Sequence, residues 1–241
     1  MLLTVAHGTR TAAGNDVARE LTAAAGDLLG WRSVCTFVEL SEPLFEDTAA
    51  AMIHQAVVVP LLLSTGYHMR HDVPRAAAGA PVPLMLSPPL GPSHVIARLQ
   101  ADRLRAAGGV PGRDRVVMVA AGSTDPLAAE DLARAGRLLG HEWGSSVEVC
   151  VLAGIGPRPH EVVRPGDVVS TYLLAPGHFA RRALHECTDA GAAVVAGVLG
   201  PSPLLVDLVI ARASASLRAS HRDPGLVARK IWLRQRSAGS A

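Results

Sequence analysis

The stretch Thr4-Val5-Ala6-His7-Gly8-Thr9 recurs 114 positions later as Met118-Val119-Ala120-Ala121-Gly122-Ser123, and this recurrence decides the fold. Two further matches follow in the same order: Pro43 with Pro157 at the same offset, and Leu62-Leu63-Ser64-Thr65-Gly66 with Leu173-Leu174-Ala175-Pro176-Gly177 at an offset of 111. Any two units of alternating strands and helices share short fragments, but three ordered matches at a nearly constant offset indicate a duplication. The sequence therefore predicts two tandem units of roughly 110 residues.

Within each unit, short apolar runs alternate with Ala-rich stretches. The strands are predicted at 2–6, 34–40, 56–63, 82–86, 116–120, 147–152, 168–174 and 193–198, and the helices at 16–29, 43–55, 92–107, 125–139, 178–190 and 203–217. The strands are continuously apolar, which is typical of a parallel sheet covered on both faces. We therefore expect an α/β fold with two tandem domains, 1–108 and 113–217, and a basic C-terminal tail, 218–241.

Composition and charge exclude several classes of protein. The 241 residues are 49% hydrophobic and 18% charged, which excludes general disorder. The formal net charge is −1 for residues 1–108, −2 for 109–217 and +5 for 218–241, so the body offers no basic face to nucleic acid. Three cysteines without CxxC spacing support neither a disulfide framework nor a four-thiolate cluster. Without a signal peptide or an apolar run of membrane-spanning length, the chain is expected to be cytoplasmic, with no membrane partner.

Polar side chains follow three successive predicted strands of the first unit. His7 follows the first strand, Glu39 ends the second, and His68 follows the third. Carboxyl ends of parallel strands meet at one edge, so these residues would converge if the strands are neighbours. Two imidazoles and a carboxylate suit a divalent first-row metal, and fewer than four protein ligands leave positions open for chemistry. The histidines could also accept protons, and metal binding should weaken as the pH falls.

The second unit serves as an internal comparison for these three residues. The counterparts of His7, Glu39 and His68 are Ala121, Ala153 and Phe179, although a gap of one residue would pair His68 with His178 instead. The first two counterparts lack ligating groups under either pairing. We infer one catalytic unit and one degenerate repeat.

Further residues on the same rim are candidates for substrate binding. His71, three residues after His68, could replace it as a ligand, and Arg10, Arg70 and Arg75 could pair with substrate carboxylates. Any one of these arginines could equally belong to an ordinary charged surface, and His7 without Glu39 and His68 would be interpreted as a cap or surface residue. The predicted substrate-binding set is Thr9, Arg10, Gly66, Tyr67, Arg70, His71 and Arg75.

These residues resemble a known family. Ala6-His7-Gly8-Thr9-Arg10 resembles the "HGS/T-R" motif of sirohydrochlorin chelatases of the CbiX/SirB type, and Phe37-Val38-Glu39 with Pro43 resembles their "FxE…P" segment. The run from Val59 to Pro74 resembles their "PxFLxxGxHxxxDIP" motif. The resemblance covers the first unit, and the second fits the degenerate duplicate of long two-domain members. Thr9 replaces the usual Ser, and His71 is an additional histidine beside the motif.

The resemblance implies a class II chelatase, a lyase of the sirohydrochlorin cobaltochelatase or ferrochelatase type. Such enzymes insert Co²⁺ or Fe²⁺ (Ni²⁺ in some relatives) into a tetrapyrrole for cobalamin or siroheme biosynthesis, without ATP or an organic cofactor. Carried over by position, His7 and His68 match the catalytic histidines and Glu39 the associated acidic residue. The implied fold is two flavodoxin-like domains that face a central cleft for sirohydrochlorin. Because one chain supplies both halves, we expect a monomer.

Two other functions remain open at the level of sequence. A non-catalytic metal or tetrapyrrole carrier would bind sirohydrochlorin without turnover. A hydrolase with His7 as nucleophile would resemble the histidine phosphatases, but those have an Arg directly before the histidine, where this chain has Ala6.

Overall fold

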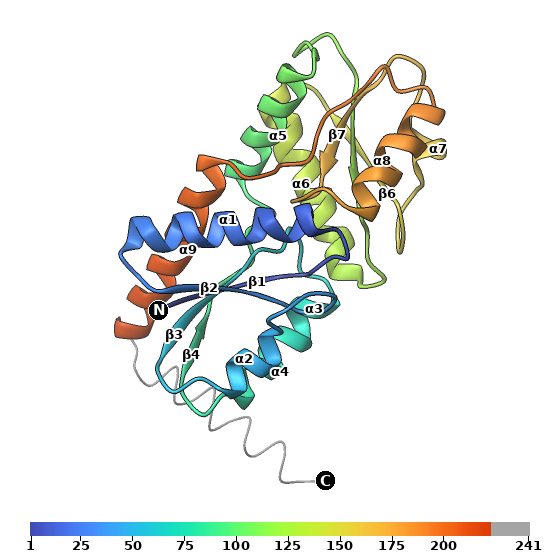
Figure 1. Cartoon of the computed structure of the whole chain (residues 1–241). Helices are drawn as coiled ribbons and strands as arrows, with labels where there is room; N and C mark the ends of the chain where they lie inside the picture. Colours follow the sequence, from blue (N-terminus) through green and yellow to red (C-terminus); the bar gives the residue numbers. More distant parts are fainter. Residues whose placement is uncertain (223–241) are drawn as a thin grey trace.

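The computed structural model describes residues 1–222, which form two four-stranded parallel sheets, one in each half of the chain (Figure 1). The strand orders are β2-β1-β3-β4 and β6-β5-β7-β8. The first sheet holds β1 (Leu2–Ala6), β2 (Ser33–Phe37), β3 (Ala56–Pro60) and β4 (Leu84–Leu86), and the second holds β5 (Val116–Ala120), β6 (Val147–Val151), β7 (Val168–Tyr172) and β8 (Val194–Val195). The same order in both sheets confirms the predicted α/β architecture of two tandem domains.

Helices cover the faces of both sheets, and the central strands β1, β3, β5 and β7 are consequently buried along their whole length. The helices are α1 (Ala12–Leu29), α2 (Phe45–Ala50), α3 (Tyr67–Arg70), α4 (Asp72–Gly79), α5 (His94–Ala106), α6 (Pro126–Trp143), α7 (Pro159–Val162), α8 (His178–Asp189) and α9 (Pro203–Arg222). Continuous burial explains why these strands are mainly apolar along their length and not at alternate positions; the polar residues they hold, Thr4, Ser170 and Thr171, are buried as well.

The last helix of each half packs against the other half. Helix α5 lies on α6 and β7, where Gln100 donates a hydrogen bond to the Ser170 hydroxyl over 2.8 Å. Helix α9 lies beside α1 and on β3, and Arg212 donates to the Leu90 carbonyl. Figure 1 shows α9 returning to the first sheet after the chain has completed the second. The predicted boundaries at 108 and 113 lie between the last strand of the first sheet and the first strand of the second. The helices α5 and α9, however, each pack against the half of the chain on the other side of these boundaries.

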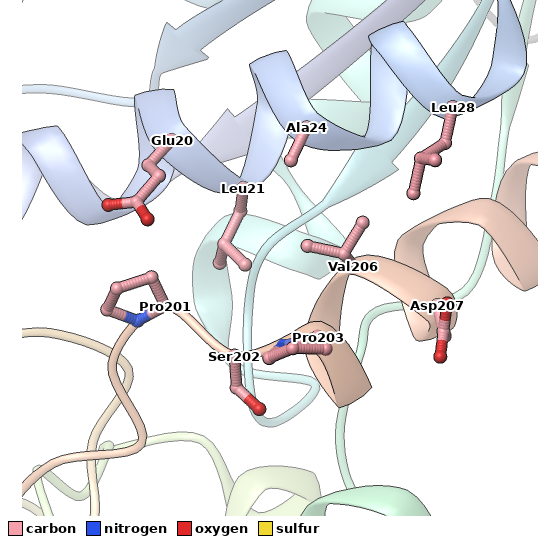
Figure 2. A pocket seen from close by; sticks show the side chains of 9 residues that line it. All are labelled: Glu20, Leu21, Ala24, Leu28, Pro201, Ser202, Pro203, Val206 and Asp207. Carbon is pink, nitrogen blue, oxygen red and sulfur yellow. The ribbon is translucent and has the colours of Figure 1, made fainter.

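One hydrophobic core runs through both halves because of this exchange. It joins Leu21 of α1, Leu99 of α5, Met118 of β5 and Leu205 of α9. Between α1 and α9 the packing leaves a shallow groove of about 340 Å³, lined by Leu21, Leu28 and Val206 with Glu20 and Asp207 at its edges (Figure 2). The two halves are thus held as one body by buried apolar side chains.

Several element limits differ from the sequence-based prediction. The strand predicted at 34–40 ends at Phe37, and the helix predicted at 43–55 spans only Phe45–Ala50. Segment 67–79, for which no helix was predicted, forms α3 and α4. Helix α9 continues to Arg222, which corrects the predicted start of the tail at 218; the rest of that tail lies outside the described residues.

Two other predictions concern membranes and cysteines. Among residues 1–222, no helix is long and apolar enough to cross a membrane. Cys35, Cys150 and Cys187 are free cysteines, and the latter two are buried.

Candidate functional site

His7, Glu39 and His68 come together at the carboxyl edge of the first sheet. His7 directly follows β1, Glu39 lies two residues after β2, and His68 lies on α3, which follows β3. One ligand atom from each residue lies within 4.8 Å of the other two, and within residues 1–222 this is the one such group of three metal-ligating side chains. The predicted convergence is confirmed because β2, β1 and β3 are adjacent in the sheet.

The three side chains face one another across a small open space. Nε2 of His7 lies 3.7 Å from Oε1 of Glu39, and the rings of His7 and His68 meet edge to face with centroids 4.7 Å apart. The side chains of His7 and Glu39 are 48% and 50% exposed, and that of His68 is 29% exposed. The cluster is therefore accessible from solvent, as a site that takes up a ligand must be.

Backbone geometry fixes the position of His7 relative to Glu39. The Glu39 amide donates a hydrogen bond to the His7 carbonyl over 3.1 Å. Gly8 has a φ of +94°, and a Cβ at this position would overlap the Glu39 carbonyl oxygen. Leu40, directly after Glu39, has a φ of +64°. Only a residue without a Cβ fits at Gly8, so the His-Gly pair is a steric requirement of the site.

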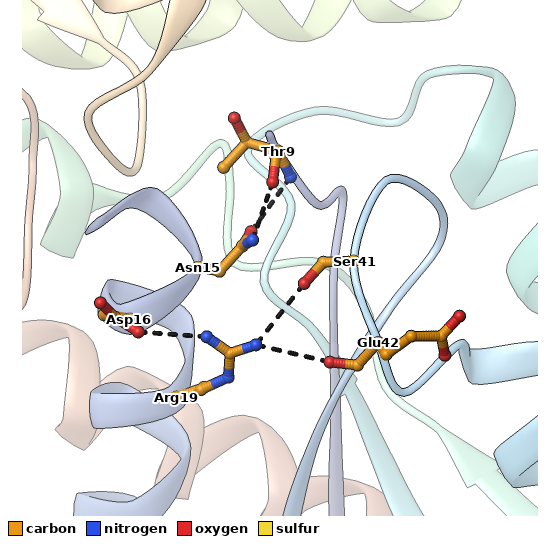
Figure 3. Close-up of polar contacts among 6 residues, drawn as sticks. All are labelled: Thr9, Asn15, Asp16, Arg19, Ser41 and Glu42. Atoms are coloured by element: carbon orange, nitrogen blue, oxygen red, sulfur yellow. Dashed lines mark hydrogen bonds and ion pairs between the residues drawn. The ribbon is translucent and has the colours of Figure 1, made fainter. Parts of the chain in front are cut away.

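Hydrogen bonds hold the loops that follow His7 and Glu39, at Thr9 and at Ser41 and Glu42 (Figure 3). The Thr9 amide donates to Oδ1 of Asn15, and Nδ2 of Asn15 donates to the Thr9 carbonyl, over 3.0 and 2.8 Å. Arg19 of α1 donates to the Glu42 carbonyl and lies over the Phe37 ring at 5.2 Å. These contacts give Thr9, predicted to bind substrate, a structural role in the loop that presents His7.

His68 has a carboxylate partner that sequence reasoning missed. Its Nδ1 lies 2.7 Å from Oδ2 of Asp72. A carboxylate at Nδ1 places the proton on that nitrogen and leaves Nε2 as the free lone pair, an arrangement typical of metal-ligating histidines. Similarly, Nδ1 of His7 lies 3.2 Å from the Gly8 carbonyl, which leaves Nε2 toward Glu39. The available signal was the four-residue spacing of His68 and Asp72, which in a continuous helix would place them on one face; here His71 separates α3 from α4 and the pair still forms.

Of the residues predicted to bind substrate, some lie on the surface beside α3 and α4 and others contact the second half of the chain. Arg70 forms an ion pair with Asp125 of the second half at 3.2 Å. His71 stacks on the Tyr67 ring, with centroids 4.6 Å apart, and lies outside the cluster, so the ligand geometry favours His68 over His71. Tyr67, Arg70, His71 and Arg75 line a recess of about 510 Å³ beside α3 and α4.

Three more rim residues complete the predicted set. Arg75 lies between Glu46 and Asp72, with contacts of 3.9 and 3.8 Å. Arg10 is exposed. Gly66 precedes α3 and packs against the second half, where a Cβ would lie 3.5 Å from the Ser123 hydroxyl. Of the three predicted arginines, Arg70 and Arg75 already have carboxylate neighbours in the structure.

The second half repeats the backbone of this site without its chemistry. The Ala153 amide donates to the Ala121 carbonyl over 2.9 Å, as Glu39 does to His7. Gly122 has a φ of +86°, and a Cβ there would overlap the Ala153 carbonyl, as at Gly8. Helix α8 starts at His178 as α3 starts at Tyr67, so Phe179, and not His178, corresponds to His68. The structure thus supports the pairing with Ala121, Ala153 and Phe179.

The two halves meet beside these equivalent positions. A Cβ at Gly177 would lie 3.3 Å from the Thr9 hydroxyl, just as Gly66 approaches Ser123. The Thr65 amide donates to Asp131 over 2.7 Å, and the Tyr172 hydroxyl donates to the Leu63 carbonyl over 2.8 Å. Burial raises the pKa of Tyr172, which keeps this hydroxyl a hydrogen-bond donor. The strand-end loops of both halves therefore share one junction.

Comparison with known proteins agrees with this architecture. The family model CbiX matches residues 1–107. A sirohydrochlorin ferrochelatase from Bacillus subtilis (strain 168) is 30% identical over 188 residues, which cover 72% of this chain and 72% of that protein. A sirohydrochlorin ferrochelatase from Priestia megaterium is 29% identical over 223 residues, covering 83% and 84%. The solved structure of SirB from Bacillus subtilis with Fe³⁺ has a TM-score of 0.75 at 23% identity, covering 89% of this chain and 94% of that one.

Proposed function

Because the chain belongs to the CbiX family, we propose that it is a sirohydrochlorin chelatase that inserts a divalent metal, Co²⁺ or Fe²⁺, into the macrocycle. The cluster of His7, Glu39 and His68 carries this proposal, since its ligand atoms lie within 4.8 Å of one another on an open edge of the sheet. Imidazole and carboxylate ligands suit first-row divalent metals. The similarity to two sirohydrochlorin ferrochelatases supports the choice of macrocycle.

Metal insertion requires the loss of two protons from the macrocycle. The metal-free macrocycle carries two pyrrole N–H groups, and M²⁺ replaces both protons, so charge balances when two H⁺ leave. The Nε2 atoms of His7 and His68, freed by hydrogen bonds at Nδ1, are the acceptors we assign to these protons. Glu39, 3.7 Å from His7, assists metal entry or proton exit.

The three ligands also hold the metal before transfer. Three protein ligands leave coordination positions that the four pyrrole nitrogens can take over. Each metal–nitrogen bond to the macrocycle then replaces a bond to the protein. The exposure of His7 and Glu39 suits this exchange, because a fully enclosed site would retain the ion.

The test is metal insertion followed by absorbance of the macrocycle. Purified protein, sirohydrochlorin and Co²⁺, or Fe²⁺ without oxygen, should react faster than the spontaneous rate. His7→Ala and His68→Ala should each lower the rate roughly 100-fold, the range expected for loss of a positioned base. His185→Ala is the matched control, because His185 also pairs with an aspartate four residues on but lies on α8, outside the cluster.

The outcomes separate a chelatase from a carrier. Binding of sirohydrochlorin without turnover above the spontaneous rate would identify a carrier. If His7→Ala and His68→Ala stay within a few-fold of the unsubstituted protein, the assignment is wrong. Equal concentrations of Co²⁺ and Fe²⁺ in one reaction then determine which metal the enzyme prefers.

A further inference from the structure

We infer that Phe179 of the second half binds the flat face of the tetrapyrrole, opposite the metal cluster, and that Leu40 contacts the same macrocycle from the first half. This inference rests on the proposed function and assigns a role to the half that lacks the cluster. The class of ligand is a macrocycle with a flat apolar face and carboxylates at its periphery.

The equivalence of the two halves carries the first step. Phe179 occupies the position of His68, while alanines occupy those of His7 and Glu39, on a backbone with the same hydrogen bonds and the same positive φ. The second half therefore presents methyl groups and an aromatic ring where the first presents ligands. Phe179 is 38% exposed, and its ring centroid lies 5.5 Å from that of His178 and 5.9 Å from the Arg182 guanidinium. An exposed aromatic ring is a suitable surface for stacking.

A contact between the halves lies two residues from Phe179 and two residues from His7. Phe179 lies two residues after Gly177, which packs against the Thr9 hydroxyl, and His7 lies two residues before Thr9. A Cβ at Gly14 would also overlap the Pro176 carbonyl, so this junction is closely packed. His7 and Phe179 thus flank one junction from opposite halves.

Exposed apolar side chains recur next to the cluster positions and their counterparts in the sequence. Of nine large hydrophobic side chains exposed in the described part of the chain, four lie within two residues of a cluster position or its counterpart: Leu40, Tyr67, Ile155 and Phe179. Apolar surface collected beside polar groups marks a binding site for a ligand of mixed character. A macrocycle with an apolar face and nitrogen atoms at its centre matches that combination.

Leu40 adds an independent observation. Its φ of +64° disfavours a residue with a branched side chain, and its counterpart in the second half is Gly154, with a φ of +72°. The leucine side chain is 50% exposed and adjoins Glu39. A side chain that strains the backbone and is half exposed contributes little to folding, so its contribution is to a ligand.

The experiment measures sirohydrochlorin affinity without metal, by absorbance titration, in Phe179→Ala and Leu40→Gly. Glycine suits the positive φ of Leu40, and Phe179 is partly exposed, so neither substitution should unfold the chain. We expect dissociation constants raised about tenfold for Phe179→Ala and about threefold for Leu40→Gly, from the loss of apolar contact. Leu184→Ala, at a 56% exposed position on the same helix, should bind like the unsubstituted protein.

A second titration, with Co²⁺ alone, distinguishes an effect of Phe179→Ala on macrocycle binding from an effect on the metal cluster. Phe179→Ala should bind Co²⁺ within twofold of the unsubstituted protein; a larger loss would place its effect on the metal cluster and overturn the inference. Unchanged sirohydrochlorin affinity in Phe179→Ala, or an equal loss in Leu184→Ala, would also overturn it while the unsubstituted enzyme still inserts metal. Absence of both binding and turnover in the unsubstituted protein would instead overturn the proposed function.

Discussion

Asp72 should control the metal affinity of a cluster to which it contributes no ligand. Its carboxylate lies 2.7 Å from Nδ1 of His68, which is the short distance of a charge-assisted hydrogen bond. Asp72→Asn keeps the shape but offers a neutral amide in place of the charge. Hydrogen bonds to charged groups contribute about 1.5–3 kcal/mol. Both side chains are nearly 30% exposed, so the lower part of that range applies.

A loss of about 1.4 kcal/mol corresponds to a factor of ten. We therefore expect Asp72→Asn to weaken Co²⁺ binding and to lower kcat/KM about 10- to 30-fold, within the range for partners of metal-ligating histidines. The assay is Co²⁺ titration by calorimetry, followed by the insertion assay. Circular dichroism should show an unchanged fold, because Asp72 lies at the start of a short surface helix.

Asp189→Asn is the matched control for this prediction. Asp189 contacts Nδ1 of His185 at 3.1 Å with the same four-residue spacing, but on α8. The control should bind Co²⁺ and turn over as the unsubstituted protein does. Co²⁺ affinity of Asp72→Asn within twofold of the unsubstituted protein, or an equal loss in Asp189→Asn, would refute the reasoning.

Three further predictions concern the scaffold. Gly8→Ala should abolish Co²⁺ binding because the new Cβ would displace the Glu39 carbonyl. The control is Gly30→Ala, at a φ of +65° with no atom nearby, which should lose only about 1 kcal/mol of stability and keep its Co²⁺ affinity. Equal Co²⁺ affinities of the two variants would contradict the steric argument. Tyr172→Phe leaves the Leu63 carbonyl unpaired at the junction and should lower the free energy of unfolding in urea by about 1–3 kcal/mol, while an unchanged midpoint would refute that role. The hydrogen bond from Arg115 lowers the pKa of Glu148, so this pair stabilises the fold above the ordinary glutamate pKa and its contribution is lost as the pH falls through the lowered value. Glu148 is half exposed, so Glu148→Gln should lower the free energy of unfolding by less than about 1 kcal/mol at pH 7 and should leave it unchanged at low pH. A difference in unfolding free energy between the two proteins that is the same at every pH would contradict this prediction.

The parts of the fold that the sequence predicts best are those set by local pattern. The central strands β1, β3, β5 and β7 are mainly apolar runs without alternation because both faces of each sheet are covered, and the structure confirms these strands. The convergence of His7, Glu39 and His68 followed from the same pattern, since parallel strands place their carboxyl ends at one edge. These inferences needed no knowledge of distant contacts.

The parts that the sequence could not predict depend on contacts between distant residues. Gln100 of α5 reaches Ser170 and Arg212 of α9 reaches Leu90, but nothing in the repeat reveals that these helices pack across the halves. Arg70 was predicted to face substrate, and its partner Asp125 lies 55 residues away in the other half. Leu40 was passed over because a leucine gives no sign of a positive φ.

The asymmetry between the halves follows from the requirements of metal insertion. A macrocycle that receives a metal on one face must be held on its other face. The metal ligands and the groups that hold the ring must therefore lie at fixed positions on the two sides of one junction. Duplication supplies two equivalent backbones, as the matching hydrogen bonds at Glu39 and Ala153 show, and their strand-end loops meet where Gly177 approaches Thr9 and Gly66 approaches Ser123. Metal ligands in both halves would bind two ions and leave no apolar surface for the macrocycle. In the second half Phe179 stands where the first half has His68, and this replacement turns a metal site into a surface that binds the macrocycle.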